Sequence, residues 1–218
     1  MSSSVDLDVV ARSAFSAVIS DICDRLGYRK QSLAIQIQPR TLTDKVLVGW
    51  ARPVKADVVD SPPPQPYDRE IAFVDSLELD DVVVADCSES PDAFWGELFS
   101  SAALARGARG AVINGSIRDV HRIQAAGFPV HSASTAPTDS LGRLRILHQD
   151  NPITLGNVSI SRGDLVVSDI DGTVIVPRAI ATEVIRLAVE KASIETSALH
   201  MLQSGSLLRD VWEKHHVL

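Results

Sequence analysis

An arginine and an aspartate, Arg118 and Asp119, stand side by side where an apolar segment gives way to one of helical composition. The apolar residues 111–113 predict a short buried strand, which residues 114–116 are expected to end, and a helix is expected from Ile117 onward. The pair would then lie at the carboxyl end of a strand, where α/β proteins bind their ligands. Asp119 offers hard oxygen ligands of the kind that Mg²⁺ or Mn²⁺ takes, and Arg118 offers a planar cation suited to a carboxylate or a developing oxyanion.

A helix is predicted just before this strand, from Trp95 to Arg106, and Gly107 stands where a left-handed residue commonly ends a helix. The backbone N–H groups at its start, near Gly96 and Glu97, could hold a second anionic group. The apolar residues at helical spacing are Leu98, Ala102 and Ala105. Together with the Arg-Asp pair, this helix start predicts a site for a small acid that chelates a metal ion. The alternative is a solvated ion pair at a helix start, where an acid is favoured electrostatically.

Composition restricts the class of protein. The chain has 218 residues, of which 45% are hydrophobic and 22% charged, so we expect a single domain over 1–218 with a substantial core. A net charge of −7 argues against binding to a nucleic-acid backbone. The apolar runs are shorter than a membrane span and the start of the chain does not resemble a signal peptide, so we expect a cytoplasmic protein. Cys23 and Cys87 lie in apolar segments, and we expect buried free thiols.

Hydrophobic patterns predict an alternation of helices and strands. An amphipathic helix is expected over 6–26, ended by Gly27, while Pro53 and the proline-rich run 61–66 are expected to frame a loop. The other predicted helices are 67–77 with Ile71, Val74 and Leu77 inward, a long helix after Pro177, and one that opens near 204–206. The predicted strands, besides that at 111–113, are 34–37, 46–51, 81–85, 129–131, 143–148, 153–160, 165–168 and 173–176.

The segment Asp169-Ile170-Asp171-Gly172-Thr173, which follows an apolar strand, resembles the first motif of haloacid-dehalogenase-type phosphatases. Those enzymes use the first Asp as a nucleophile and the second as an acid/base. In that family the motif lies near the start of the domain, and too little of the chain follows Thr173 here to carry the later motifs. We therefore expect a β-hairpin with an Asp-Gly turn.

Several motifs together resemble the RraA-like family, which includes the class II 4-hydroxy-4-methyl-2-oxoglutarate aldolases and the regulator of ribonuclease E activity. The resemblance runs through nearly the whole chain. The segments that carry it are Gly96-Glu97-Leu98, Gly107, Gly110, Gly115-Ser116-Ile117-Arg118-Asp119, Phe128-Pro129-Val130, 163–169, 171–177, Glu195 and Gly205-Ser206-Leu207, with a looser match at Val48-Gly49-Trp50-Ala51.

This resemblance implies a fold, an assembly and an activity. The fold would be α/β, a layered α/β/β/α sandwich of the swivelling β/β/α type. The assembly would be a homotrimer or hexamer with active sites at subunit interfaces, and neither nucleic acid nor membrane is expected as a partner. The activity would be cleavage of a 4-hydroxy-2-oxo acid to pyruvate through a metal-stabilised enolate, with oxaloacetate decarboxylation as a second activity.

The resemblance also implies residue roles. Asp119 would anchor Mg²⁺ or Mn²⁺, and Arg118 would bind the keto-acid end of the substrate and stabilise the enolate. Backbone amides of the segment Gly96-Glu97-Leu98-Phe99 would hold the pyruvyl carboxylate.

Two further acids would complete the water shell of the metal. Glu97 is expected to position a metal-bound water, with Asp86 behind it, and Glu195 would come from the neighbouring subunit. His121 and His131 are close to the site in sequence, but each is expected to be a structural or exposed histidine rather than a general base.

Two other functions stay open at this point. One is a non-catalytic protein-binding module of the ribonuclease-regulator type, for which an acidic chain could offer complementary charge to a basic partner. The other is a related lyase that acts on a different hydroxy-oxo acid, for instance one derived from a sugar acid.

Overall fold

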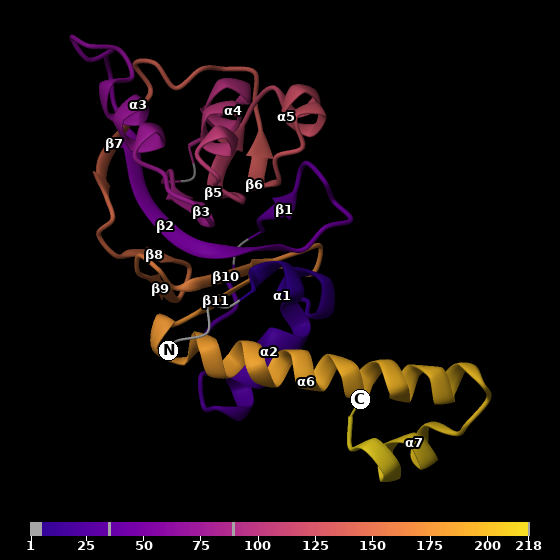
Figure 1. Ribbon diagram of the computed structural model, residues 1–218. Helices are drawn as coiled ribbons and strands as arrows, with labels where there is room; N and C mark the ends of the chain where they lie inside the picture. The colour runs from indigo at the N-terminus through magenta and orange to yellow at the C-terminus, as the bar shows by residue number, and fades with distance from the viewer. Residues whose placement is uncertain (1–5, 35, 89, 218) are drawn as a thin grey trace.

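A curled sheet of nine strands forms the centre of the computed structural model, which describes residues 6–34, 36–88 and 90–217 (Figure 1). Its strands are β1 (Gln38–Pro39), β2 (Leu47–Val58), β3 (Asp81–Asp86), β4 (Ala93–Trp95), β5 (Gly110–Ile117), β6 (Val130–Thr135), β7 (Leu144–Gln149), β10 (Leu165–Ser168) and β11 (Thr173–Val176). A separate hairpin consists of β8 (Ile153–Leu155) and β9 (Val158–Ile160). The helices are α1 (Leu7–Ser13), α2 (Ser16–Arg25), α3 (Asp68–Asp75), α4 (Glu97–Ala105), α5 (Val120–Ala126), α6 (Arg178–Gln203) and α7 (Leu208–His215).

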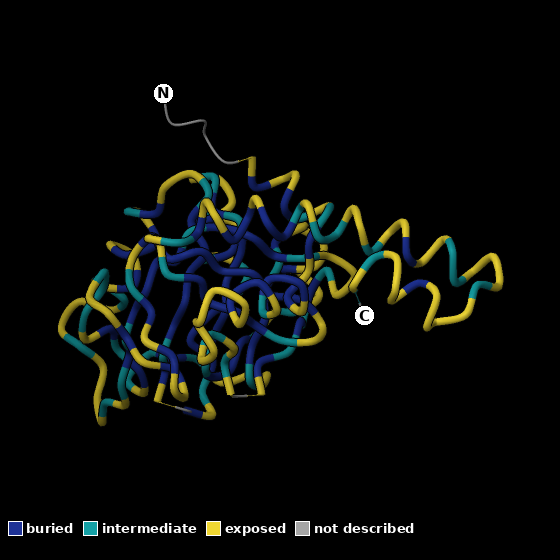
Figure 2. Tube along the Cα trace, turned by 90° about the horizontal axis from the view of Figure 1, so that it is seen from below, coloured by how far each residue is buried: buried dark blue, intermediate teal, exposed yellow. Residues whose placement is uncertain are grey.

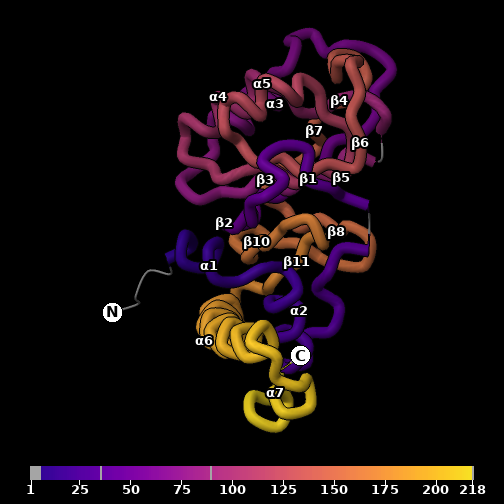
Figure 3. Tube along the Cα trace, turned by 90° about the vertical axis from the view of Figure 1, so that its right-hand side faces the viewer, coloured from indigo at the N-terminus to yellow at the C-terminus, as the bar shows by residue number. Residues whose placement is uncertain are grey.

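The long strand β2 joins the two halves of this sheet. One edge of β2 runs parallel to β3, which continues through β5 to β6. The other edge pairs antiparallel with β10 at residues 47–50 and with β7 at residues 54–58. The curl along β2 brings the two halves face to face, with α3, α4 and α5 outside one half and α1, α2 and α6 outside the other (Figures 1 and 3).

Alternation along the strands sorts the buried side chains into three cores. On β3, Val83 and Ala85 face the layer of α3, α4 and α5, whereas Val82 and Val84 face inward between the two halves of the sheet. The same alternation places β10 and β11 residues either inward or against α1, α2 and α6. Three cores between four layers are what an α/β/β/α sandwich requires, so the predicted fold class is confirmed.

The N-terminal helix predicted over 6–26 is two helices. The chain breaks at Ala14 and Phe15, and Ser16 begins α2 by donating its backbone N–H and its hydroxyl to the buried carboxylate of Asp169, at 2.7 and 2.6 Å. This long-range contact takes the place of a continuous helix, and it leaves Phe15 exposed at the break. Because Asp169 holds a helix start, the phosphatase-like motif is structural, and β10 and β11 form the predicted hairpin.

Four strand predictions need correction. The single strand predicted over 153–160 is instead the hairpin of β8 and β9, because the chain turns at 156–157. Residues 114–116 do not end β5, because the strand continues to Ile117 past an irregularity in its pairing with β6. Pro53 lies inside β2, opposite Val84, and not in a loop. The strand predicted over 34–37 is absent at the described positions 34, 36 and 37 and begins instead at Gln38, while Ile35 lies outside the described residues.

The C-terminal half of α6 and all of α7 extend away from the layered body, as Figure 2 shows. Exposed and partly exposed residues dominate this arm. The described residues contain no helix that is long and apolar enough to cross a membrane. Cys23 and Cys87 are buried and unpaired with each other, as the sequence predicted.

Candidate active site

The end of β5 presents the Arg-Asp pair, as predicted. The backbone N–H of Arg118 donates to the carbonyl oxygen of Trp95 at 2.9 Å, which ties the end of β5 to the end of β4. Asp119 follows in the left-handed region, with φ 59°, and stands at the N-cap position of α5 without a capping hydrogen bond from its side chain. This backbone conformation, which Asp tolerates better than most residues, turns the chain away from the sheet. Its carboxylate Oδ2 accepts the backbone N–H of Glu97 at 3.2 Å.

The short strand β4 brings the start of α4 to this point. β4 runs parallel to the end of β5, with Trp95 opposite Ile117, so Gly96 and Glu97 begin α4 beside the Arg-Asp pair. Trp95 is fully buried and anchors the turn, because its indole N–H donates to Ser100 Oγ at 2.8 Å and this hydroxyl donates to the carbonyl of Gly96 at 3.0 Å. The helix predicted from Trp95 to Arg106 is confirmed, although it begins two residues later, at Glu97, and ends at Ala105.

The buried face of α4 differs from the prediction. Ser100 and Ala103 are buried, whereas the side chain of Leu98 is 80% exposed. The hydrogen bonds of Ser100 to Trp95 and Gly96 fix the rotation of the helix and turn Leu98 outward.

Gly96 has no room for a side chain. A Cβ at this position would lie 2.8 Å from Asp119 Oδ2 and 3.3 Å from Arg118 Cγ. We expect Gly96→Ala to displace the Asp119 carboxylate and to lower kcat/KM for the reaction proposed below by about tenfold to a hundredfold, while thermal unfolding changes little. Gly27→Ala is a matched control, since a Cβ there meets nothing within 4 Å, although its φ of +89° adds strain. Full activity in Gly96→Ala would contradict the close approach.

A pocket of about 560 Å³ opens in front of this pair. The residues that line it include all of those marked by the sequence at the start of the helix and at the end of the strand: Gly96, Glu97, Leu98, Phe99, Arg118 and Asp119. The remaining wall comes from β4, from α3 and the residue before it, from the middle of α4, and from the loop before β7. The volume is in the usual range for small-molecule sites.

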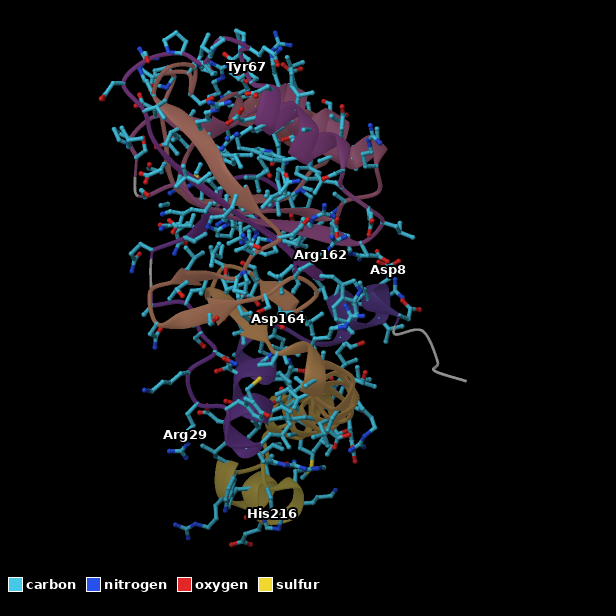
Figure 4. The ribbon with its side chains drawn as sticks, turned by 90° about the vertical axis from the view of Figure 1, so that its left-hand side faces the viewer. Asp8, Arg29, Tyr67, Arg162, Asp164 and His216 are labelled. Atoms are coloured by element: carbon cyan, nitrogen blue, oxygen red, sulfur yellow. The ribbon has the colours of Figure 1, made fainter. Side chains whose placement is uncertain are left out.

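Two lining residues escaped the sequence analysis. Arg118 Nη1 lies 3.3 Å from Asp139 Oδ1, and the hydroxyl of Tyr67 donates to the other carboxylate oxygen of Asp139. Burial, together with this hydrogen bond to a carboxylate, raises the pKa of Tyr67 to about 12, so it stays protonated. Tyr67 lies at the end of the molecule opposite His216 (Figure 4). Asp139, which is held by the Tyr67 hydroxyl, therefore contacts one side of the Arg118 guanidinium. On the other side, Asp119 Oδ2 lies 3.7 Å from Arg118 Nε.

Comparisons with known proteins show the family of this chain. A family model described as "RraA-like: Aldolase/RraA" matches residues 17–175, a range that contains every pocket residue named above. The chain belongs to the RraA-like family.

Similar proteins carry different names. This RraA-like chain is 29% identical over 191 residues to a protein of Halalkalibacterium halodurans named "Putative 4-hydroxy-4-methyl-2-oxoglutarate aldolase", covering 86% of this chain and 84% of that protein. It is 25% identical over 144 residues to Protein DlpA of Legionella pneumophila, which covers 66% of this chain. The match spans only 23% of DlpA, and another match spans 57% of the uncharacterized protein MJ0644 of Methanocaldococcus jannaschii.

A solved structure adds a further relative. The crystal structure of Streptomyces coelicolor RraAS2, described as an unusual member of the RNase ES inhibitor RraA protein family, superposes with a TM-score of 0.76 at 26% identity. The superposition covers 89% of this chain and 96% of the RraAS2 chain. The RraA-like family thus includes a relative named as an aldolase and one described as belonging to a family of ribonuclease inhibitors.

Other sequence-marked acids lie away from the RraA-like pocket. Asp86 ends β3 and pairs with Lys55, at 2.8 Å. Glu195 lies on the projecting part of α6, 3.3 Å from Lys191, and its role in a neighbouring subunit stays a prediction. Glu97 stays at the pocket, with its carboxylate 3.6 Å from Arg122.

Neither histidine lines the pocket. His121 is exposed on α5. His131 is fully buried on β6, where its Nδ1 lies 2.7 Å from Ser168 Oγ.

The donor set at Asp119 fits a hard divalent cation. Mg²⁺ keeps several waters and takes one or two carboxylates rather than an all-protein cage. The Asp119 side chain is 38% exposed, and its Oδ1 accepts no hydrogen bond from the residues that the structure describes. Over the same residues, no group of three or more His, Cys, Asp or Glu side chains converges on one point. A site here would therefore rest on Asp119 and water.

Proposed function

We propose that this RraA-like protein is a divalent-metal-dependent lyase that cleaves a 4-hydroxy-2-oxo acid to pyruvate and a carbonyl compound, and that also decarboxylates oxaloacetate. The observation that carries the proposal is the convergence of Arg118, Asp119 and the start of α4 on one pocket. A cation, a hard carboxylate and unpaired backbone N–H groups are what a 2-oxo acid needs for recognition.

Asp119 would hold Mg²⁺ or Mn²⁺, with Glu97 orienting water near it. When bound, such an ion supplies Lewis-acid polarisation of the 2-oxo group. The backbone N–H of Glu97 fixes the position of the Asp119 carboxylate, so the ligand is oriented before any substrate arrives.

Arg118 would bind the oxygen on which negative charge develops. Its guanidinium is held from two sides by Asp139 and Asp119, which restricts it to one position. Preorganised donors of this kind stabilise a developing charge without reorganisation during the reaction. The N–H groups of Leu98 and Phe99, in the first turn of α4, would receive the substrate carboxylate.

The reaction balances without any further reagent. The hydroxyl proton at C4 passes to a base, the C3–C4 bond breaks, and its electron pair moves into the pyruvyl fragment. Protonation at C3 then gives pyruvate, and C4 leaves as a carbonyl. With oxaloacetate, the same electron pair comes from the bond to the departing CO₂.

An oligomer is part of the proposal. We propose a homotrimer or hexamer in which Glu195 reaches the site of a neighbouring subunit, because within its own chain Glu195 lies in the second half of α6 and does not line the pocket. Analytical ultracentrifugation of the full chain would check the assembly.

The test couples pyruvate release to lactate dehydrogenase. We expect the protein to release pyruvate from oxaloacetate with Mg²⁺, to lose this turnover with excess EDTA, and to regain it when Mg²⁺ is restored. 4-Hydroxy-4-methyl-2-oxoglutarate is assayed beside it under the same conditions. Samples with Mg²⁺ but no protein correct for spontaneous decarboxylation. A folded protein that releases pyruvate from neither acid would overturn the proposal. It would then favour a non-catalytic regulatory role, since the Streptomyces relative is described as a member of an RNase ES inhibitor family.

A further inference from the structure

The pocket continues beyond Arg118 into a space between α3 and α4, and its walls there are apolar. The side chains that face this space are Ile71, Val74, Phe94, Leu98, Phe99 and Ala102. Ile71 is 51% exposed and Leu98 is 80% exposed, although the sequence predicted that Ile71 would be buried. Val74 and Phe94 belong to the core behind this wall, whereas Ile71 and Leu98 stay exposed at the opening. Large apolar side chains that stay exposed together at an opening mark a binding surface.

The charged groups around this space are almost all acidic. Asp75, Glu97, Asp119 and Asp139 line the pocket, and Arg118 is the only cation among the described lining residues. Arg106 lies 2.9 Å from Asp75, and Arg122 lies 3.6 Å from Glu97, so these two cations outside the lining are already paired with acids that line the pocket. Within one chain, a second carboxylate on the substrate would enter an apolar space bordered by more acids than cations.

The size of the pocket also exceeds what a pyruvyl group needs. A pocket of about 560 Å³ compares with roughly 30 Å³ for each liquid water that it would otherwise hold. The six non-hydrogen atoms of a pyruvyl group at Arg118 and the start of α4 would leave the apolar part of the pocket for the rest of the substrate.

We infer that the group carried on C4 of the substrate is uncharged and apolar, so that the carbonyl product is an aliphatic or aromatic aldehyde rather than a second oxo acid. This inference rests on the proposed function and adds the substrate class. Phe99 stacks edge-on against buried Trp95, with ring centroids 5.5 Å apart, which gives the apolar wall a rigid base.

The test runs the reaction in the direction of synthesis. Pyruvate loses a proton from its methyl carbon, this carbon bonds to the aldehyde carbon, and the aldehyde oxygen takes up a proton. Two aldehydes of similar shape are compared, succinic semialdehyde with a terminal carboxylate and 4-methylpentanal with an isopropyl group in its place. Glyceraldehyde serves as an uncharged but hydroxylated third probe.

We expect kcat/KM for 4-methylpentanal to exceed that for each of the other two aldehydes by about tenfold or more. Ile71→Lys should shift the ratio toward succinic semialdehyde by about fivefold, because it adds a cation at the apolar wall. Leu147→Lys is the matched control, since Leu147 is also 51% exposed but lies on β7 away from the pocket lining, and it should leave the ratio unchanged.

The outcomes separate the inference from the function on which it rests. Oxaloacetate turnover with equal or better use of succinic semialdehyde or glyceraldehyde would overturn the substrate class alone. Oxaloacetate turnover without addition to any aldehyde would do the same. If oxaloacetate and all three aldehydes fail in a folded protein, the proposed function fails, and the substrate class fails with it.

Discussion

Replacing Asp119 by asparagine is expected to lower kcat/KM for oxaloacetate decarboxylation by about 10³-fold. Asparagine keeps the shape of the side chain and an oxygen that can accept the Glu97 N–H, so the start of α4 should stay in place. What it removes is the negative charge that would hold a divalent cation. The measurement is coupled pyruvate release at saturating Mg²⁺, with circular dichroism to confirm the fold.

The control for this variant is Asp171→Asn, which removes a carboxylate from the exposed β10–β11 turn. It should retain wild-type activity, and it also tests the phosphatase-like motif directly. Wild-type turnover in Asp119→Asn, or loss of turnover in Asp171→Asn, would contradict the assignment of the site.

The second large effect concerns stability and pH. Burial lowers the pKa of His131 from 6.5 to about 4. Its Nε2 has no hydrogen-bond partner among the described residues, so a proton added there would be buried without compensation. Nearby Asp169 favours the charged form but does not offset the burial. His131 is therefore neutral in the folded protein over a range in which the unfolded chain binds a proton.

The direction in which the free energy of unfolding changes with pH follows from proton uptake. Between pH 6.5 and 4 the unfolded state holds more protons at His131, so this group lowers the free energy of unfolding as the pH falls. The shift corresponds to a loss of about 3 kcal/mol from pH 7 to pH 4, complete once the pH falls below the folded pKa. Urea unfolding at a series of pH values measures it.

Two histidine variants separate the effect of His131 from that of the acids that titrate in the same pH range. His131→Asn should flatten the pH dependence relative to the wild type, even if it lowers stability at pH 7, because an amide does not titrate. His121→Asn, at an exposed position, should leave the pH dependence as it is. An unchanged slope in His131→Asn would contradict the prediction.

The part of the site that the sequence predicted is the part built from local patterns. A short apolar strand followed by a charged pair, and a helix that begins after a glycine, can be recognised from adjacent residues, and Arg118, Asp119 and Gly96 are placed accordingly. Tyr67 and Asp139 carry no such pattern. They are separated by 72 positions and meet only because the loops before α3 and β7 reach the same end of the sheet.

The errors in the fold also have physical causes. Residues 114–116 contain a glycine and polar side chains, but pairing with neighbouring strands holds them in β5. The apolar residues Leu98 and Ile71 fit a buried helical face by spacing alone, yet they line the pocket. A hydrophobic pattern does not distinguish a side chain that packs into a core from one that would pack against a ligand.

The long strand β2 has a consequence for how the chain reaches this fold. Residues 47–50 of β2 pair with residues 165–168, so one edge of the strand stays open until β10 is available. Contacts between such distant segments slow folding, and an unpaired edge is a template for association between chains. During synthesis, the part of the chain that carries Arg118 and Asp119 would emerge before the strand that closes the inner core. Pauses or stops in synthesis between β9 and β10 should therefore damage productive folding more than the distance of this stretch from the site suggests.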